Sequence, residues 1–215
     1  ILNKTGKPLV VHAAEMAAQS KHVDQVVVAG DHDEIKQAVA PFGFEYINTG
    51  AHHTSGSSRC AEVMERVAAD IVVNVQGDEP EVEPDHIDAV ITAMTDPEVR
   101  CSTLACPLAP GQQDNPNVVK VAMSCDGTAM YFSRSLIPYD RDNTGINRWR
   151  HVGLYAYRPD TLRQFCQWSQ TPMEQAEQLE QLRLLENGIQ IRVVTHQEPS
   201  PPGVDTLEQY ESFVE

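Results

Sequence analysis

Short apolar runs alternate with amphipathic segments along the first half of the chain, which is the pattern of an α/β fold. The runs QVVVA at 25–29, FEYI at 44–47 and IVVNV at 71–75 have the length and the β-branched content of strands. Apolar residues at helical spacing predict helices before and between these runs, at residues 9–20, 33–42 and 60–69. Strands and helices that alternate at this spacing predict βαβ units with right-handed crossovers.

The second half changes character, because strand patterns follow one another with few helices between them. Asp126-Gly127, between two apolar runs, predicts a hairpin turn. The predicted strands are residues 101–107, 118–123, 129–135, 151–158 and 189–195. The predicted helices are residues 84–95, 159–168, 173–186 and a short one from 206. We therefore expect antiparallel strands to join a parallel sheet within one domain.

The segment DIVVNVQGDEP, residues 70–80, is the centre of the predicted fold. Its near-continuous Val/Ile run is typical of a strand that is buried on both faces inside a parallel sheet. Gly77 allows a sharp turn, and Pro80 prevents the strand from continuing. Asp78 then lies at the carboxyl edge of a central strand, where α/β sheets bind ligands. Carboxylates there suit Mg²⁺, although an isolated GDE is equally consistent with a simple acidic turn.

Charge and cysteine content narrow the class of protein. The 215 residues carry a net charge of −15, from 31 acidic and 16 basic side chains, so they lack the basic face that nucleic acid requires. Binding of a nucleotide through a bridging cation remains compatible with this negative charge. The five cysteines form no CxxC pair, which favours reduced thiols in a cytoplasmic protein over zinc or disulfides. No apolar run is long enough to cross a membrane, and no signal-peptide pattern is present.

Two further segments carry polar groups next to helix starts. In HHTSGSSRCAE, small residues precede a helix whose free N–H groups favour an anion or a base edge, and a flexible capped loop is the alternative. In PPGVDT, Asp205 precedes the last helix. It is either an ordinary N-cap or a second carboxylate that converges on the metal of Asp78.

Polar side chains on two predicted strands and one helix are a third group of candidates. Arg suits a carboxylate, and Ser, Tyr and His suit sugar hydroxyls. For any one of the strand residues, packing within the core is the more economical interpretation, whereas the helix residues would more often lie on the surface. The strand residues are Tyr131, Ser133, Arg134, His151, Tyr155 and Tyr157, and the helix residues are Glu177, Glu180, Gln181 and Arg183.

Together these motifs resemble the 3-deoxy-manno-octulosonate cytidylyltransferases, the CMP-Kdo synthetases. The resemblance spans essentially the whole chain in order, and VNVQGDEP with YFSRSLIPYDRD is its most specific part. The other matching segments are GKPLVVH, SGSSR, NPNVVKV, RHVGLYAYR, LEQLRLLENG and PGVDT. The loop departs from the family's SGTER at Ser57-Ser58, which concerns the base contacts rather than the loop itself.

The resemblance implies a Rossmann-like nucleotidyltransferase, a three-layer α/β sandwich with a mostly parallel sheet and added antiparallel strands. One domain would cover residues 1–215, with a sugar-binding and dimerisation part at about 101–160. The enzyme would be a cytoplasmic homodimer of lipopolysaccharide biosynthesis that joins CTP and Kdo with Mg²⁺. The implied site residues are Asp78 and Asp205 for the metal and catalysis, Ser55, Gly56, Arg59 and Gln76 for the nucleotide, and Arg134, His151, Tyr155, Glu180 and Gln181 for the sugar acid.

The family's first strand and its PARxxSxRLPGKPL loop precede the position that Ile1 matches. Lys7 of GKPLVVH matches a later GKP, so it is not expected to bind the triphosphate. We expect a chain without that loop to lose several orders of magnitude in rate. Two alternatives therefore remain: a catalytically silent relative that dimerises or binds a ligand, and a synthetase of the CMP-sialic-acid type.

Overall fold

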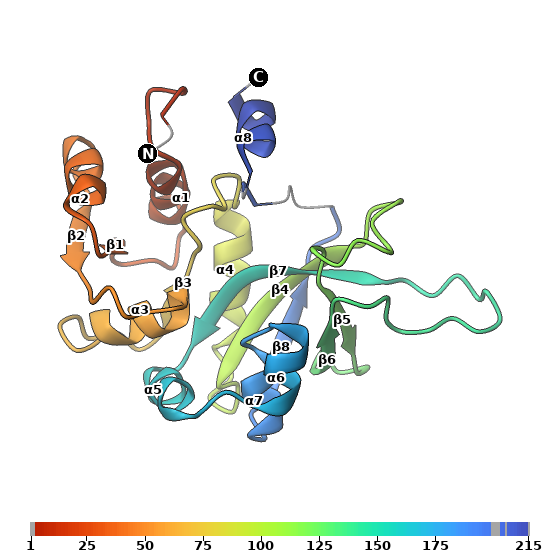
Figure 1. Cartoon of the computed structure of the whole chain (residues 1–215). Helices are drawn as coiled ribbons and strands as arrows, with labels where there is room; N and C mark the ends of the chain where they lie inside the picture. The colour runs from red at the N-terminus through yellow and green to blue at the C-terminus, as the bar shows by residue number, and fades with distance from the viewer. Residues whose placement is uncertain (1–2, 199–202, 205, 215) are drawn as a thin grey trace.

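The computed structural model describes residues 3–198, 203–204 and 206–214 (Figure 1). Its first part is the predicted βαβ unit, in which β1 and β2 pair in parallel with Val27 opposite Glu45. The apolar side of α1 packs on these strands through Val11 and Ala14. The elements of this part are α1 (Leu9–Ala18), β1 (Val27–Gly30), α2 (Asp33–Val39), a 3₁₀ turn (Ala40–Phe42), β2 (Glu45–Asn48) and α3 (Gly56–Val63).

A second sheet of six strands lies beside this unit within the described residues. The long strand β7 pairs with β4 along one edge, and with β5 and β3 along the two halves of its other edge. β8 pairs with β4, and β6 with β5. The strands are β3 (Val72–Asn74), β4 (Cys101–Pro107), β5 (Lys120–Met123), β6 (Ala129–Ser133), β7 (Trp149–Tyr157) and β8 (Ile191–Thr195).

Most strands of the larger sheet run in the same direction, but neighbouring strands pair both in parallel and antiparallel. β3, β4, β5 and β8 run one way, while β6 and β7 run the other way. Because β7 lies between β3 and β4, the apolar run at 71–75 has an antiparallel partner, not the parallel neighbours that its composition suggested. A strand's burial can be read from its sequence, whereas the identity of its neighbour depends on residues far along the chain.

Helices cover both faces of the larger sheet, which gives the predicted three layers (Figure 1). Alternate residues of β4 separate the two sides: Leu104 and Cys106 face α1 and α4, while Cys101 and Ala105 face the other cluster. That second cluster contains residues of α3, α5 and α7. The helices of the larger unit are α4 (Pro84–Ala93), α5 (Pro159–Gln167), α6 (Pro172–Glu177), α7 (Leu182–Glu186) and α8 (Leu207–Val214).

The predicted single helix at 173–186 is wrong, because the chain breaks between α6 and α7. Gln178 has a left-handed backbone with φ of 52°, and the N–H of Leu179 donates to the carbonyl of Glu174 at 3.3 Å. The leucine spacing suggested one helix, and Leu179 and Leu182 are indeed buried. The break removes Glu180 and Gln181 from a helix surface and places them in a turn.

Two features lie at the margins of the fold. The connection from β6 to β7 extends from the body as a long arm (Figure 1). The last helix, α8, packs near the start of the chain, where the Lys4 amide donates to the Tyr210 hydroxyl at 2.5 Å. Among the described residues, no helix has the length and apolar character needed to cross a membrane.

Candidate functional site

The acidic turn that follows β3 is in contact with the segment before α8. Asp78 is exposed in this turn, and its carbonyl accepts a 2.7 Å hydrogen bond from the amide of Val204. A side chain at Gly203 would come within 3.3 Å of Glu79 Oε1, so that glycine allows the two segments to approach. Asp205 lies outside the described residues. The two segments that carry the predicted acids therefore meet, although they are far apart in sequence.

The same turn faces a bulge in β7. The pairing with β4 shifts between Thr103, opposite Tyr155, and Leu104, opposite Val152. The extra residues include Gly153, whose missing side chain would lie 3.8 Å from the Gln76 side chain. Bulges of this kind bend a strand and are frequent beside active sites. Here the bulge brings β7 beneath the turn from Gln76 to Glu79.

The SGSSR loop packs directly against β3 and its turn. Ser55 is the N-cap of α3, and its hydroxyl accepts the amide of Ser58 at 3.3 Å. A Cβ on Gly56 would lie 3.1 Å from the Asn74 amide and 3.2 Å from that of Gln76. Only glycine fits without displacing these side chains. Three of the four predicted nucleotide residues, Ser55, Gly56 and Gln76, are thus brought together.

Arg59, the fourth predicted nucleotide residue, is engaged within the protein. Its guanidinium donates to Asp31 at 3.1 Å and to the Thr49 hydroxyl at 2.5 Å. The hydrogen bond from Arg59 lowers the pKa of Asp31. Because Thr49 also bonds the carbonyl of Gly30, Arg59 fastens α3 to the carboxyl ends of β1 and β2. This pair joins residues 28 positions apart, and no local sequence pattern indicates it.

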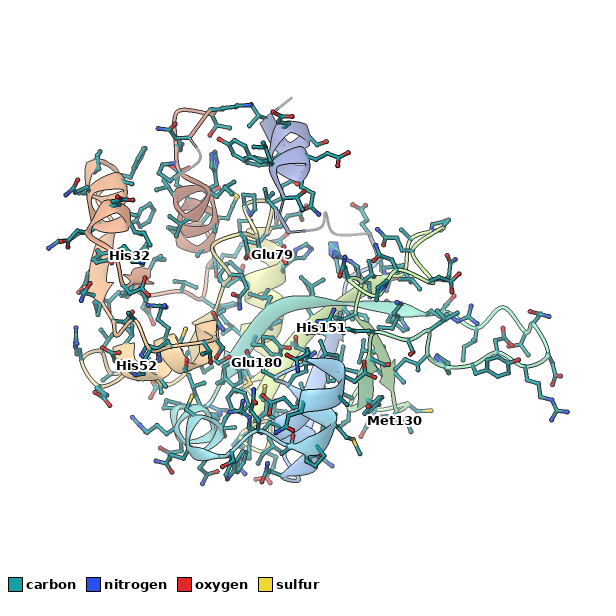
Figure 2. All side chains as sticks on the ribbon, viewed as in Figure 1. His32, His52, Glu79, Met130, His151 and Glu180 are labelled. Carbon is teal, nitrogen blue, oxygen red and sulfur yellow. The ribbon has the colours of Figure 1, made fainter. Side chains whose placement is uncertain are left out.

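His151 lies on β7 (Figure 2). Its ring shares a face with that of Tyr155, and the two ring centroids are 5.3 Å apart. The Thr103 hydroxyl donates to the carbonyl of Leu154 at 2.8 Å, so it accepts from His151 Nε2 at 3.0 Å. This assigns the proton of neutral His151 to Nε2 and makes Nδ1 an acceptor. A ligand hydroxyl is the complementary donor.

The partly buried environment of His151 predicts a specific pH dependence of stability. Burial first, and then the charge of Arg150, lower its pKa from 6.5 to about 3. The unfolded chain therefore binds a proton near pH 6.5 that the native protein binds only near pH 3. Stability from this group is complete above pH 6.5 and is lost as pH falls between these values, by up to about 1.4 kcal/mol per unit.

We expect the unfolding free energy of His151→Gln to depend less steeply on pH than that of the wild type between about pH 3 and pH 6.5. Chemical denaturation at a series of pH values measures the effect. The matched control is His32→Gln, because the His32 side chain is 74% exposed, and it should follow the wild-type curve. If His151→Gln also followed the wild-type curve, the neutral buried state of His151 would be wrong.

Glu180 connects this face to the SGSSR loop. Its Oε1 accepts a 2.7 Å hydrogen bond from the Ser57 hydroxyl. Its Oε2 is buried and has no hydrogen-bond partner among the described residues. Gln181, also buried, is the N-cap residue of α7. The position of Glu180 in the centre of the molecule can be followed in Figure 2.

The Arg134 side chain forms hydrogen bonds to backbone carbonyls. Its guanidinium donates to the carbonyls of Glu177, Pro116 and Gln178 at 2.7, 2.8 and 3.2 Å. Lys120 is fully buried beneath it and donates to the carbonyl of Arg134 at 2.8 Å. Burial lowers the pKa of Lys120. The sequence analysis missed Lys120, although a lysine inside the apolar strand pattern VVKVAM was the available signal.

Metal-ligating side chains gather at two other places in the described part of the chain. These clusters are His52, His53 and Glu62, and Glu83, His86 and His196, with ligand atoms within 4.8 Å. Their histidines already bond within each cluster, His53 to Glu62 at 2.6 Å and His86 to His196 at 2.9 Å. Both are rich in nitrogen, whereas Mg²⁺ prefers oxygen ligands. The exposed carboxylate of Asp78 therefore fits Mg²⁺ better than either cluster does.

Comparisons with known proteins identify the family of this chain. Residues 1–191 match the cytidylyltransferase family. A 3-deoxy-manno-octulosonate cytidylyltransferase from Chlorobium phaeobacteroides is 44% identical over 211 residues, which cover 96% of this chain and 85% of that protein. The protein of the same name from Geobacter sulfurreducens is 44% identical over 223 residues, which cover 98% and 89% of the two chains.

Two solved structures share the fold. That of a CMP:2-keto-3-deoxy-manno-octonic acid synthetase complexed with CTP is 41% identical, with a TM-score of 0.95 over 99% of this chain and 88% of the other. A cytidylyltransferase from Leptospira borgpetersenii is 13% identical, with a TM-score of 0.58 over 96% and 74% of the two chains, and shows the fold alone. The expected α/β nucleotidyltransferase fold is confirmed. The chain belongs to the cytidylyltransferase family of nucleotidyltransferase enzymes.

Proposed function

We propose that this protein joins CTP and Kdo to give CMP-Kdo and pyrophosphate. The observation that carries the proposal is the meeting of three segments at Gln76: the acidic turn, the SGSSR loop and the bulge of β7. The two relatives named as 3-deoxy-manno-octulosonate cytidylyltransferases support the sugar acid, and the solved relative complexed with CTP supports the nucleotide.

In this reaction the anomeric hydroxyl of the sugar acid attacks the α-phosphorus of CTP. A P–O bond forms to the sugar, the bond to the β-phosphate breaks, and the hydroxyl proton is released. Bound Mg²⁺ would neutralise the triphosphate, with Asp78 and Asp205 as its protein ligands. The protein's remaining task is to position the two substrates.

The described residues supply that positioning in two regions. The absence of a side chain at Gly56 lets Asn74 and Gln76 pack beside the start of α3, whose free N–H groups attract negative charge. On the other side, His151 Nδ1 and Glu180 Oε2 offer two acceptors for sugar hydroxyls. Tyr155 borders the same face as His151, and Gln181 follows Glu180 directly at the start of α7. Arg134 acts through the backbone of the turn that carries Glu180.

The direct test is pyrophosphate release by the purified protein. Each of the four nucleoside triphosphates is combined with Kdo or with sialic acid, with and without Mg²⁺, and the product is identified by mass spectrometry. We expect release only with CTP, Kdo and Mg²⁺, its loss on adding EDTA, and CMP-Kdo as the product. Release with sialic acid instead would favour the related synthetase, and no release with any pair would favour a silent relative.

We further propose a cytoplasmic homodimer that serves lipopolysaccharide biosynthesis, with the arm between β6 and β7 as part of the dimer surface. Tyr139 and Ile146 on the arm are 86% and 49% exposed. The base of the arm borders a cavity of about 400 Å³. Apolar side chains on such an extension are a feature of interaction surfaces. The residues that line the cavity are Pro107, Leu108, Gln113, Ile146, Asn147, Arg148, Trp149 and Gln197.

Ile146→Asp is expected to convert the dimer to a monomer, because it places a charge in an apolar contact. Light scattering coupled to size-exclusion chromatography measures the mass. Leu207→Asp is the matched control, since Leu207 is 60% exposed but lies on α8 away from the arm, and it should stay dimeric. A wild-type monomer at all concentrations, or a dimeric Ile146→Asp variant, would contradict this surface.

A further inference from the structure

Ser57 is a fully buried hydroxyl at the junction of three parts of the site. Its side chain is 0% exposed, on the first turn of α3. It donates to Glu180 Oε1 at 2.7 Å. With its proton committed there, its oxygen accepts the Asn74 amide at 3.5 Å, and the Tyr157 hydroxyl lies at 3.4 Å. One atom therefore touches β3, β7 and the turn before α7.

The bond to Glu180 determines where that carboxylate points. A hydrogen bond to a charged oxygen is roughly twice as strong as one between neutral groups. Once Oε1 is held, the plane of the carboxylate is restricted and Oε2 has a defined direction. Because Oε2 is buried without a partner among the described residues, it carries a desolvation cost that a ligand hydroxyl would offset.

We propose that Ser57, although it lies in the nucleotide loop, is a positioning residue for the sugar acid. It holds Glu180 so that Oε2 can accept a hydroxyl of the second substrate. This inference rests on the proposed function and adds a residue to it. The contacts of Gly56 with Asn74 and Gln76 depend on its missing side chain, and the Asn74 amide lies a long 3.5 Å from the Ser57 oxygen, so nucleotide binding should depend on Ser57 much less.

The kinetic test compares Ser57→Ala with Ser57→Thr, which keeps a hydroxyl. We expect Ser57→Ala to raise the KM for Kdo about tenfold, the value of one hydrogen bond to a charged group, with little change in the KM for CTP. Ser57→Thr should restore most of the loss. Ser102→Ala is the matched control, because Ser102 is equally buried but bonds the carbonyl of Val90, and it should change neither KM.

Equal rises in both KM values, no rise at all, or failure of Ser57→Thr to rescue would overturn the proposal. A second measurement is independent of activity. In a double-mutant cycle on unfolding, the loss caused by Ser57→Ala should be smaller in a Glu180→Gln background, since the carboxylate charge is gone. Equal losses of unfolding free energy in the two backgrounds would show that Ser57 and Glu180 are not energetically coupled. A positive cycle in a protein that makes no CMP-Kdo would leave the link standing and reject the proposed reaction.

Discussion

Asp78→Asn is expected to lower turnover about 10³-fold while leaving the fold intact. The substitution keeps the shape of the side chain but removes the negative charge that would hold Mg²⁺ beside the triphosphate. Its backbone bond to Val204 involves the carbonyl of Asp78 and is retained. Because Asp78 is exposed, its loss should change the melting temperature little. Steady-state kinetics at saturating Mg²⁺ and CTP measure the effect.

The control for Asp78→Asn is Asp85→Asn. The Asp85 side chain is 81% exposed, with one weak ion pair to Lys21 at 3.6 Å, and it should keep full activity. The two variants together separate a specific metal ligand from a general loss of negative charge near the turn. An Asp78→Asn enzyme that turns over within a few fold of wild type would remove Asp78 from the metal site.

Arg183→Met is expected to cost about 3–5 kcal/mol of unfolding free energy, because it leaves the buried Glu174 carboxylate without its partner. Arg183 bonds both oxygens of Glu174, which is 4% exposed, and stacks over the Phe165 ring at 4.7 Å. It also donates to the carbonyls of Phe165 and Trp168. Denaturant unfolding measures the loss. Arg163→Met should cost at most about 1 kcal/mol, since the Asp160–Arg163 pair is exposed.

The stabilisation by the Arg183–Glu174 ion pair also depends on pH. Burial alone raises the pKa of Glu174, but the hydrogen bonds from Arg183 and Thr171 outweigh it and leave the pKa below 4.5. The pair therefore stabilises the protein above pH 4.5, and this contribution is lost as pH falls through the lowered native pKa. The gap between wild type and Arg183→Met should narrow in acid, and a gap independent of pH would contradict the ionic pair.

The double variant Glu174→Leu with Arg183→Met should recover much of the lost stability, since it removes both buried charges. Its activity should not recover equally. Arg183 lies one turn after Glu180 and Gln181, and it ties their turn to α5 through Phe165 and Trp168. We therefore expect a raised KM for Kdo to persist in the double variant. Full recovery of that KM would show that Arg183 acts on stability alone.

Much of the fold could be predicted because local patterns determine it. The alternation of apolar residues located β4, β7 and β8, and Gly127 with its φ of 80° formed the predicted hairpin. The predicted turn formed at Gly77 and Asp78, although β3 itself already ends at Asn74. Two predictions were wrong. The antiparallel neighbour of β3 is a strand far along the chain, and the left-handed backbone of Gln178 divides one amphipathic pattern into two helices. Leucines at helical spacing stay buried on either side of such a break.

The candidate site shows the same division. Motifs located Gly56 and Gln76, and the structure gave them one shared contact. The bond between Ser57 and Glu180 joins residues 123 positions apart, and no local pattern indicates it. Lys120 differs from both, because its position within an apolar strand made burial predictable even though its carbonyl partners were not. A local sequence pattern can indicate that a residue is buried or lies in a loop, whereas its hydrogen-bond partners depend on the topology of the fold.

We propose that Asp78 and Asp205 share one divalent ion beside the triphosphate. The decisive measurement is a crystal structure with CTP and Mn²⁺, in which the ion is located by its anomalous signal. We expect one peak beside the triphosphate with a carboxylate oxygen from each aspartate at about 2.0–2.2 Å. An ion bound instead by the Glu83, His86 and His196 cluster, with neither aspartate in contact, would contradict the account.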